Sequence, residues 1–194
     1  MASIADKIMG IVKADGRGTR LYRASDFMRL SSTPAIWQAL TRLTKAGILR
    51  RVARGIYDFP RHSNVLNTAV PPNIDAVAKT LGAVAKDDLA AANALGLTTA
   101  VPVRPSYLTA GPTRTRVVGN MVVEMRHAPA WLLALRDTPA MAIVQALRFL
   151  GPDGARDAVP KLKSRVTPSI ACALASARVV GWLDRPVRQL AAAA

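Results

Sequence analysis

The chain has 194 residues, of which 51% are hydrophobic, and this is enough for one large hydrophobic core or two small ones. No stretch approaches the ~18 consecutive apolar residues of a membrane span, and the single cysteine, Cys172, excludes an internal disulfide bond. The 27 Lys and Arg exceed the 12 Asp and Glu by 15, which favours a polyanionic partner.

The predominance of Arg over Lys favours nucleic acid over a membrane surface as the polyanionic partner. Twenty of the 27 basic residues are Arg, whose planar guanidinium suits phosphate groups and guanine edges. A high-GC genome also enriches Arg, and this alternative explanation of the excess stays open. The charge is concentrated near the N-terminus, because residues 1–62 carry twelve Lys and Arg against four Asp. The first residues lack the basic head and apolar block of a signal peptide, so we expect a cytoplasmic protein.

The first elements are expected to be short. Apolar residues recur at helical spacing over residues 3–14 and predict a first helix, which Gly16 and Gly18 follow. Leu21 and Tyr22 are expected to form a brief extended segment. Ser25 is placed to cap a second helix that turns at Ser31-Ser32.

The most informative helix is expected at residues 33–46. Thr33 is predicted to cap it, and Pro34 sits where a missing N–H costs nothing. Ile36, Leu40 and Leu43 form an apolar stripe at helical spacing. Gly47 is a natural end for the helix.

A basic hairpin follows this helix directly. Residues 48–53 read as a strand, Arg54-Gly55 as a tight turn, and residues 56–59 as the returning strand. A helix followed by such a hairpin is typical of a winged helix-turn-helix, in which the helix enters the major groove of DNA and the hairpin contacts the backbone.

These patterns give a specific set of candidate contacts to double-stranded DNA. Gln38 can pair with adenine and Arg42 with guanine, while Lys45 suits a phosphate. The full expected interface comprises Thr33, Gln38, Thr41, Arg42 and Lys45 on the helix and Arg50, Arg51 and Arg54 on the hairpin. The hairpin residues are expected to hold the DNA backbone. Trp37 is interpreted as partly buried packing, with base stacking as the alternative.

We therefore expect an α+β protein, predominantly helical, with three segments. Residues 1–62 form the winged helix-turn-helix, residues 63–72 a linker ending in Pro71-Pro72, and residues 73–194 a mixed α/β domain. Helices are expected at 73–81 and 87–95. Strands of a small antiparallel sheet are expected at 106–110, 114–118 and 121–126. After Pro129 the chain is expected to be helical, with segments at 138–150, 154–163, 167–180 and from 184. The lone Cys172 is expected to be buried in the segment at 167–180.

No constellation in the sequence indicates catalysis, and we expect no enzyme, cofactor or metal. Glu124 is the only Glu, and His62 and His127 stand 65 positions apart without a second ligand at metal-site spacing. Neither a dinucleotide-binding glycine motif nor a phosphate-binding loop is present. Asp87 and Asp88 are adjacent, so their carboxylates point apart on a helix, where they complement its dipole.

Several segments of the chain resemble the AbiEi-like antitoxin family. They are Ala39–Leu43, Lys45–Arg51 and Ala53–Pro60, then Ala91–Leu97, Val101-Pro102, Tyr107–Thr109 and Gly111. The resemblance covers about residues 3–127. It implies an antitoxin whose winged helix represses its own operon at inverted repeats in the promoter. It also implies that the C-terminal domain counteracts a nucleotidyltransferase toxin, indirectly or by direct contact. Ala100 departs from the family, which often has Gln there.

Alternatives to this function stay open. The second domain could act on RNA or modify a toxin, because Arg104, Arg114, Arg116 and Arg126 surround the expected strands and offer a basic surface. The protein could also be a stand-alone winged-helix regulator. Binding to inverted repeats is compatible with a dimer or with two independent monomers.

Overall fold

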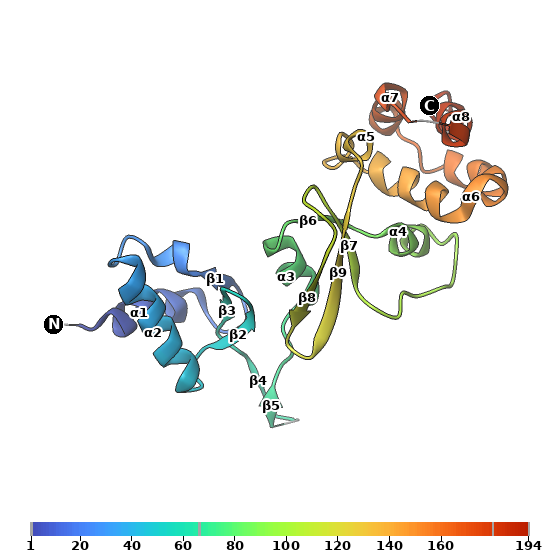
Figure 1. Ribbon diagram of the computed structural model, residues 1–194. Coiled ribbons are helices and arrows are strands. Elements are labelled where there is room, and N and C mark those ends of the chain that lie inside the picture. The colour runs from blue at the N-terminus through green and yellow to red at the C-terminus, as the bar shows by residue number, and fades with distance from the viewer. Residues whose placement is uncertain (1, 66, 180, 194) are drawn as a thin grey trace. The chain divides into compact units, whose positions relative to one another are not determined.

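The computed structural model describes residues 2–65, 67–179 and 181–193 of an α+β chain (Figure 1). Its residues group into two compact units. The N-terminal unit comprises residues 1–81 together with 116–122, and the C-terminal unit comprises residues 82–115 and 123–194. Within the described ranges, no helix combines the length and apolar character needed to cross a membrane.

The N-terminal unit begins with three helical segments and a small sheet. Its elements are α1 (Ile4–Asp15), β1 (Leu21–Arg23), the 3-10 helix η1 (Ala24–Phe27), α2 (Thr33–Lys45), β2 (Arg50–Ala53) and β3 (Ile56–Asp58). The helix α1 starts at a capping box, in which Ser3 and Asp6 satisfy each other's backbone N–H groups. The predicted order of helix, strand, short helix, helix and hairpin is therefore present.

The helix α2 forms on the stripe that the sequence predicted. Ile36, Leu40 and Leu43 are buried in the core of this unit, together with Ile8 of α1 and Phe27 of η1. The predicted cap was wrong by one residue: Ser32 occupies the extended N-cap position and Thr33 is the first helical residue. Position 34 still tolerates proline, because it lies in the first turn, where N–H groups have no intrahelical partner.

The second predicted helix is shorter than expected. It is the single 3-10 turn η1, whose start is fixed by the Asp26 carboxylate accepting from the Arg23 backbone N–H at 2.9 Å, and not by Ser25. Phe27 is buried, but Met28 is 59% exposed. Met28 follows the turn as its C-cap and lies at the surface.

The three-stranded sheet has the order β1-β3-β2 and is antiparallel throughout. Arg50 lies opposite Asp58, Arg51 opposite Tyr57, and a bulge follows Arg51. The turn between β2 and β3 needs Gly55, whose φ of 74° lies in the left-handed region.

The segment predicted as a linker carries short elements. It contains the two-stranded hairpin β4 (His62–Ser63) and β5 (Thr68–Ala69), and α3 (Ile74–Thr80) follows with Asn73 as its N-cap. The compact N-terminal unit extends through α3 to Leu81.

The C-terminal unit combines a mixed sheet with a helical end. Its elements are β6 (Ala83–Lys86), α4 (Asp88–Ala94), β7 (Ser106–Thr109), β8 (Arg114–Val118), β9 (Met121–His127), α5 (Ala130–Leu133), α6 (Ala140–Lys163), α7 (Pro168–Ser176), the 3-10 helix η2 (Gly181–Leu183) and α8 (Asp184–Ala191). The strand order is β6-β7-β9-β8, and residues 116–122 of the last two strands group with the N-terminal unit. The prediction of a purely antiparallel sheet was wrong, because β9 runs parallel to β7, and β6 was not predicted at all.

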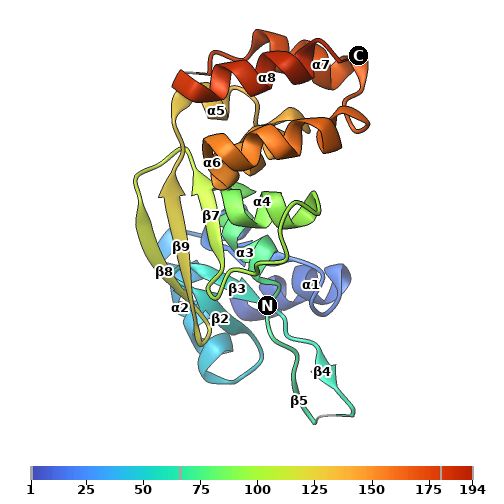
Figure 2. The ribbon, with the colours of Figure 1, turned by 90° about the vertical axis from the view of Figure 1, so that its right-hand side faces the viewer.

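The long helix α6 organises the core of this unit. Ile143, Val144 and Leu147 are buried on it, and α7 and α8 lie side by side next to it (Figure 2). Its helical geometry breaks at Gly151, where φ is 72° and ψ is −178°, and this break separates the two helices predicted at 138–150 and 154–163. Cys172 is exposed on α7, so the prediction of a buried thiol was wrong.

Candidate nucleic-acid interface

The outer face of α2 carries the predicted base-reading residues. Gln38, Thr41, Arg42 and Lys45 are all exposed, and their spacing of three and four residues places them along one face of the helix. Neither Arg42 nor Lys45 forms an ion pair with any residue in the described part of the chain. Thr41 Oγ1 donates to the Trp37 carbonyl at 2.8 Å, and its oxygen can still accept a hydrogen bond. This face therefore presents an amide, a hydroxyl and two unneutralised cations.

Two further residues at the start of α2 add to this face. Thr33 is exposed in the first turn. Trp37 is 45% exposed, so it is partly buried, as interpreted from the sequence, and part of its indole remains open to solvent. The buried stripe of α2 runs through Ile36, Ala39, Leu40 and Leu43, and position 37 lies beside that stripe on the solvent side. An exposed indole next to cationic side chains is a surface on which a base or sugar can pack.

The hairpin places two of the three predicted arginines outward. Arg51 is exposed on β2, and Arg54 is exposed in the turn before Gly55. No ion pair links either one to another described residue. Both guanidinium groups are available for phosphate oxygens.

Arg50, which the sequence assigns to the DNA backbone, is engaged within the protein. Its Nε donates to Asp58 Oδ1 at 3.1 Å, its Nη2 donates to Asp58 Oδ2, and its Nη1 donates to the Val70 carbonyl at 2.8 Å. Asp58 is only 4% exposed. A carboxylate this deeply buried needs a cation with a matching pair of N–H groups, and Arg50 supplies it. The interactions tie the hairpin to the segment after β5.

Arg17 also serves the inside of this unit. Its guanidinium lies 4.1 Å from the centre of the Phe59 ring, and its Nη1 donates to the Pro60 carbonyl at 3.1 Å. The backbone N–H of Gly18 donates to the Phe59 carbonyl at 2.7 Å. These contacts fix the strand that leaves the hairpin. The sequence carried no signal for them beyond the proximity of basic and aromatic residues.

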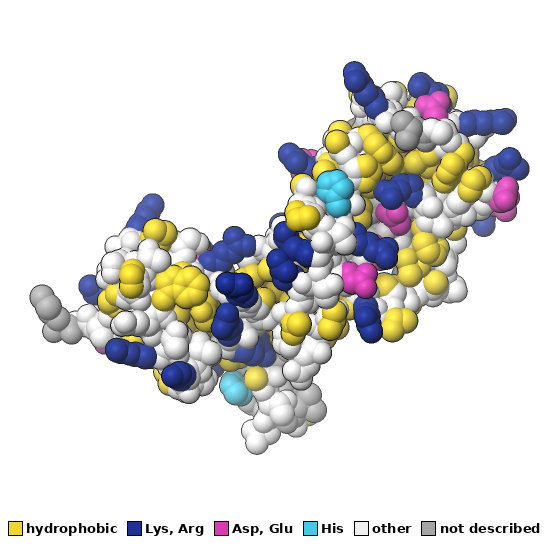
Figure 3. Space-filling view, viewed as in Figure 1, with side chains coloured by type: hydrophobic (Ala, Val, Ile, Leu, Met, Phe, Trp, Pro, Cys, Tyr) yellow, Lys and Arg dark blue, Asp and Glu magenta, His cyan; other side chains and the backbone are white. Residues whose placement is uncertain are grey.

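The charge distribution on this unit is strongly one-sided. On the face of the N-terminal unit seen in Figure 3, Lys and Arg side chains are numerous and Asp and Glu side chains are nearly absent. Asp58 is buried against Arg50 and Asp15 lies 3.5 Å from Arg20, so each of these two acids is engaged by an arginine outside the α2 face. The positive field is therefore not cancelled locally, which favours attraction of a polyanion.

The four arginines predicted as a second basic surface are dispersed. Arg104 lies in the loop before β7, Arg114 and Arg116 on β8, and Arg126 on β9. Arg126 forms an ion pair with Glu124 at 3.6 Å, and Arg114 packs against Gly82 and Gly111, where added Cβ atoms would lie 3.8 and 3.3 Å from its guanidinium nitrogens. Arg116 groups with the N-terminal unit and the other three with the C-terminal unit.

Buried polar residues of the C-terminal unit serve its packing. Asp88 of α4 pairs with Arg148 of α6 at 3.4 Å, and Gln145 Nε2 donates to the Lys86 carbonyl at 2.7 Å. Burial raises the pKa of the Asp88 carboxyl above its ordinary value, while Arg148 opposes that rise. The described residues contain no group of three or more His, Cys, Asp or Glu that could hold a metal ion.

Comparison with known proteins gives one assignment. A family of unknown function, DUF6088, matches residues 7–167. The chain belongs to the DUF6088 family. The match begins in α1, includes α2 and the β2–β3 hairpin, and ends before α7, so the candidate interface lies wholly within the DUF6088 region. No curated protein and no solved structure matches the chain.

Proposed function

We propose that this DUF6088 protein is a DNA-binding antitoxin of an AbiE-like toxin–antitoxin system that represses its own operon. The observation that carries the DNA-binding part is the outer face of α2. Gln38, Thr41, Arg42 and Lys45 lie exposed along one helix face, and the two cations among them lack ion-pair partners in the described chain. Unneutralised cations gathered on one helix face are the electrostatic footprint expected of a nucleic-acid-binding surface.

The order of elements supports a winged-helix module for this unit. A helix, a short strand, a helical turn, a second long helix and a two-stranded hairpin follow one another, and β1 completes the sheet beside β3. In such a module α2 lies in the major groove and the β2–β3 hairpin lies against the backbone.

Each side chain then has a distinct role in this proposal. Gln38 pairs with adenine and Arg42 with guanine, and both contacts specify sequence. Lys45, Arg51 and Arg54 contact phosphates and position the protein. Arg50 is assigned to the fold of the hairpin, because its donors are already engaged by Asp58 and Val70.

The antitoxin part of the proposal rests on the resemblance to AbiEi-like proteins. Its most specific segment is Asn93 to Leu97, and Asn93 Nδ2 donates to the carbonyls of Thr98 at 3.3 Å and Ala100 at 3.1 Å. These contacts hold the loop after α4. Both acceptors are backbone atoms, so the contact does not require Gln at position 100, where this chain departs from the family.

The DNA-binding part is tested by titrating the full chain against a fluorescent duplex from the region upstream of its own gene. A scrambled duplex of the same composition is the control. We expect a preference of at least tenfold for the upstream duplex at moderate salt, and log affinity should fall with log salt by roughly 0.9 for each neutralised phosphate. Equal affinity for the two duplexes would remove the regulatory role.

The antitoxin part needs a separate test. The nucleotidyltransferase gene expected beside this one is induced with and without the full chain, and growth is measured. Rescue of growth by the chain supports the proposal. Lack of rescue, or the absence of such a neighbouring gene, leaves a DNA-binding regulator without antitoxin activity.

A further inference from the structure

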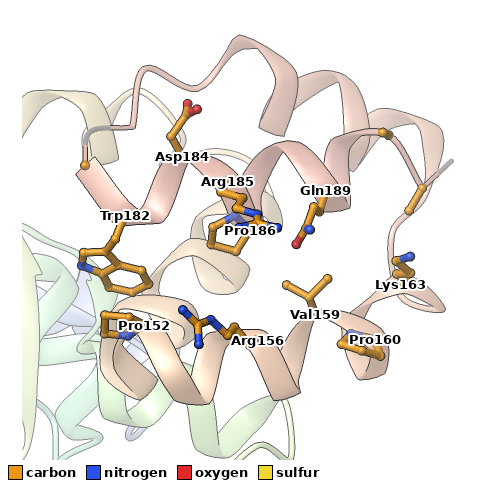
Figure 4. Close-up of a pocket in the computed structure, with 13 residues that line it drawn as sticks. Pro152, Arg156, Val159, Pro160, Lys163, Trp182, Asp184, Arg185, Pro186 and Gln189 are labelled. Atoms are coloured by element: carbon orange, nitrogen blue, oxygen red, sulfur yellow. The ribbon is translucent and has the colours of Figure 1, made fainter.

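A groove of about 830 Å³ lies in the C-terminal unit, apart from the candidate DNA interface. One side is the second half of α6, residues 152–163, and the other side is residues 181–193, which include η2 and α8. In Figure 4, Trp182 and Pro152 mark one end of the groove and Lys163 the other. The helices thus enclose an elongated depression.

The floor of the groove is apolar. Val159, Pro160 and Pro186 line it, and Ala192 and Ala193 offer small side chains that permit close approach. Trp182 is 42% exposed. An indole held at the end of an apolar groove is the kind of anchoring residue that dominates protein interfaces.

The rim of the groove is basic. Arg156, Lys163 and Arg185 line it, whereas Asp184 is the one acid among the described lining residues. Asp184 Oδ2 already accepts from Arg188 Nε at 2.8 Å, so its charge is neutralised on its own helix. Arg156 has only a solvent-exposed contact of 3.5 Å with Asp153, and such contacts are weak. The rim therefore carries a net positive charge.

We propose that this groove binds an amphipathic helix of a partner protein that carries acidic residues on its polar face. Twelve residues of α6 form the long side and extend roughly 16 Å at 1.5 Å per residue, which matches about three turns of a docked helix. The apolar side of that helix packs on Val159, Pro186 and Trp182. Its carboxylates face the basic rim, as in helix-in-groove recognition.

The composition of the groove favours a protein over a nucleic acid as the occupant. Three of its thirteen described lining residues are proline, and the floor offers few donors to a sugar–phosphate backbone. This inference deepens the antitoxin part of the proposed function, because it gives the C-terminal unit a protein ligand. It is independent of DNA binding by α2.

The test uses the full chain and two fluorescent peptides of about 15 residues. Both are designed helices with the same leucine face, and the polar face carries Glu in one and Lys in the other. We expect the Glu peptide to bind at least tenfold more tightly than the Lys peptide. Equal binding of the two peptides, or no binding of the Glu peptide, overturns the proposal.

Matched variants locate the binding. Trp182→Ala should weaken the Glu peptide at least fivefold, whereas Phe149→Ala, which removes another aromatic side chain of similar exposure on α6 outside the groove, should leave it unchanged. Lys163→Glu should weaken it, whereas Lys161→Glu, two residues away on the same helix and outside the groove, should change it less than twofold. Equal effects within either pair contradict the assignment.

A final measurement separates the proposals. An excess of unlabelled tRNA should not displace the Glu peptide, and displacement would reassign the groove to nucleic acid and overturn the proposal. The Trp182→Ala variant should bind the upstream duplex like the wild type. If the Glu peptide binds as predicted but the duplex shows no preference, only the DNA-binding proposal fails. If the duplex shows the predicted preference but the Glu peptide does not bind, only the groove proposal fails.

Discussion

The base of the β2–β3 hairpin and the outer surface of the same unit use arginine in opposite ways. At the base, Arg17 and Arg50 are engaged by Phe59, the Pro60 and Val70 carbonyls and the buried Asp58. On the outer surface, Arg42, Arg51 and Arg54 are exposed and have no ion-pair partner in the described chain. Arginine at the base stabilises the fold, and arginine on the surface remains available for a ligand.

Arg50 and Arg51 make the difference clearest, because they are neighbours on one strand. Successive side chains of a strand point to opposite faces, so adjacent arginines meet different surroundings. Arg50 lies opposite Asp58 in the sheet register, and Arg51 lies opposite Tyr57. A count of positive charges cannot distinguish them, whereas the position of the acidic partner does.

The largest predicted effect is on stability. Arg50→Ala leaves the Asp58 carboxylate buried without a partner, so we expect the free energy of unfolding to fall by about 3 kcal/mol. Arg51→Ala should change it by less than about 0.5 kcal/mol, because the side chain is exposed. Urea titration of both variants measures this, and equal destabilisation would remove the distinction between base and surface.

The next effect is on DNA affinity. Arg42→Ala should cost about 1–3 kcal/mol of binding free energy on the upstream duplex and relax the preference for a guanine-containing site. Arg29→Ala removes an exposed arginine of the same unit outside the α2 face and is the control. Fluorescence anisotropy at fixed salt compares them, and a larger loss from Arg29→Ala would place the interface elsewhere.

A smaller effect concerns another inward-facing group. Tyr22 is buried and donates to Asp15 Oδ2 at 3.0 Å, and burial followed by this hydrogen bond raises the pKa of its phenol from 10.0 to about 12. The folded state therefore holds this proton more tightly than the unfolded state does. The resulting stabilisation is complete below pH 10 and is lost as the pH rises through about 12.

Tyr22→Phe tests this directly. At neutral pH the variant should lose about 1 kcal/mol of stability with the hydrogen bond. Between pH 10 and 12 the stability difference between wild type and variant should shrink. A difference that stays constant over this window would show that the phenol does not titrate as its environment predicts.

The smallest effect is expected from the tip of the hairpin. Arg54→Ala removes one phosphate contact, so it should weaken the upstream and scrambled duplexes equally and reduce the salt slope by about one. Measuring affinity for both duplexes at four salt concentrations checks this. Loss of preference for the upstream duplex would instead assign base reading to Arg54.

The sequence predicted the parts of the fold that local patterns determine. The apolar stripe of α2, the turn at Gly55 and the helix break near Gly151 follow from helical spacing and from the conformational freedom of glycine. The parallel pairing of β7 with β9 and the engagement of Arg50 depend on residues distant in sequence.

The same limit applies to the candidate interface. Gln38, Thr41, Arg42 and Lys45 could be placed together from their spacing on one helix. The groove beside Trp182 could not be predicted, because it is formed by two segments of the chain that meet only through the packing of α8 on α6.

The placement of α2 in the major groove is tested most directly by attaching a DNA-cleaving iron chelate to a single cysteine at position 38. Because Cys172 is exposed, the background carries Cys172→Ser, and Gln38→Cys is compared with Arg29→Cys. If α2 lies in the major groove, the chelate at position 38 should cleave the strands within a few base pairs of the protected upstream site, and the chelate at position 29 should cleave little. Equal cleavage from both positions, or none from position 38 on a bound duplex, would contradict the placement of α2 in the major groove.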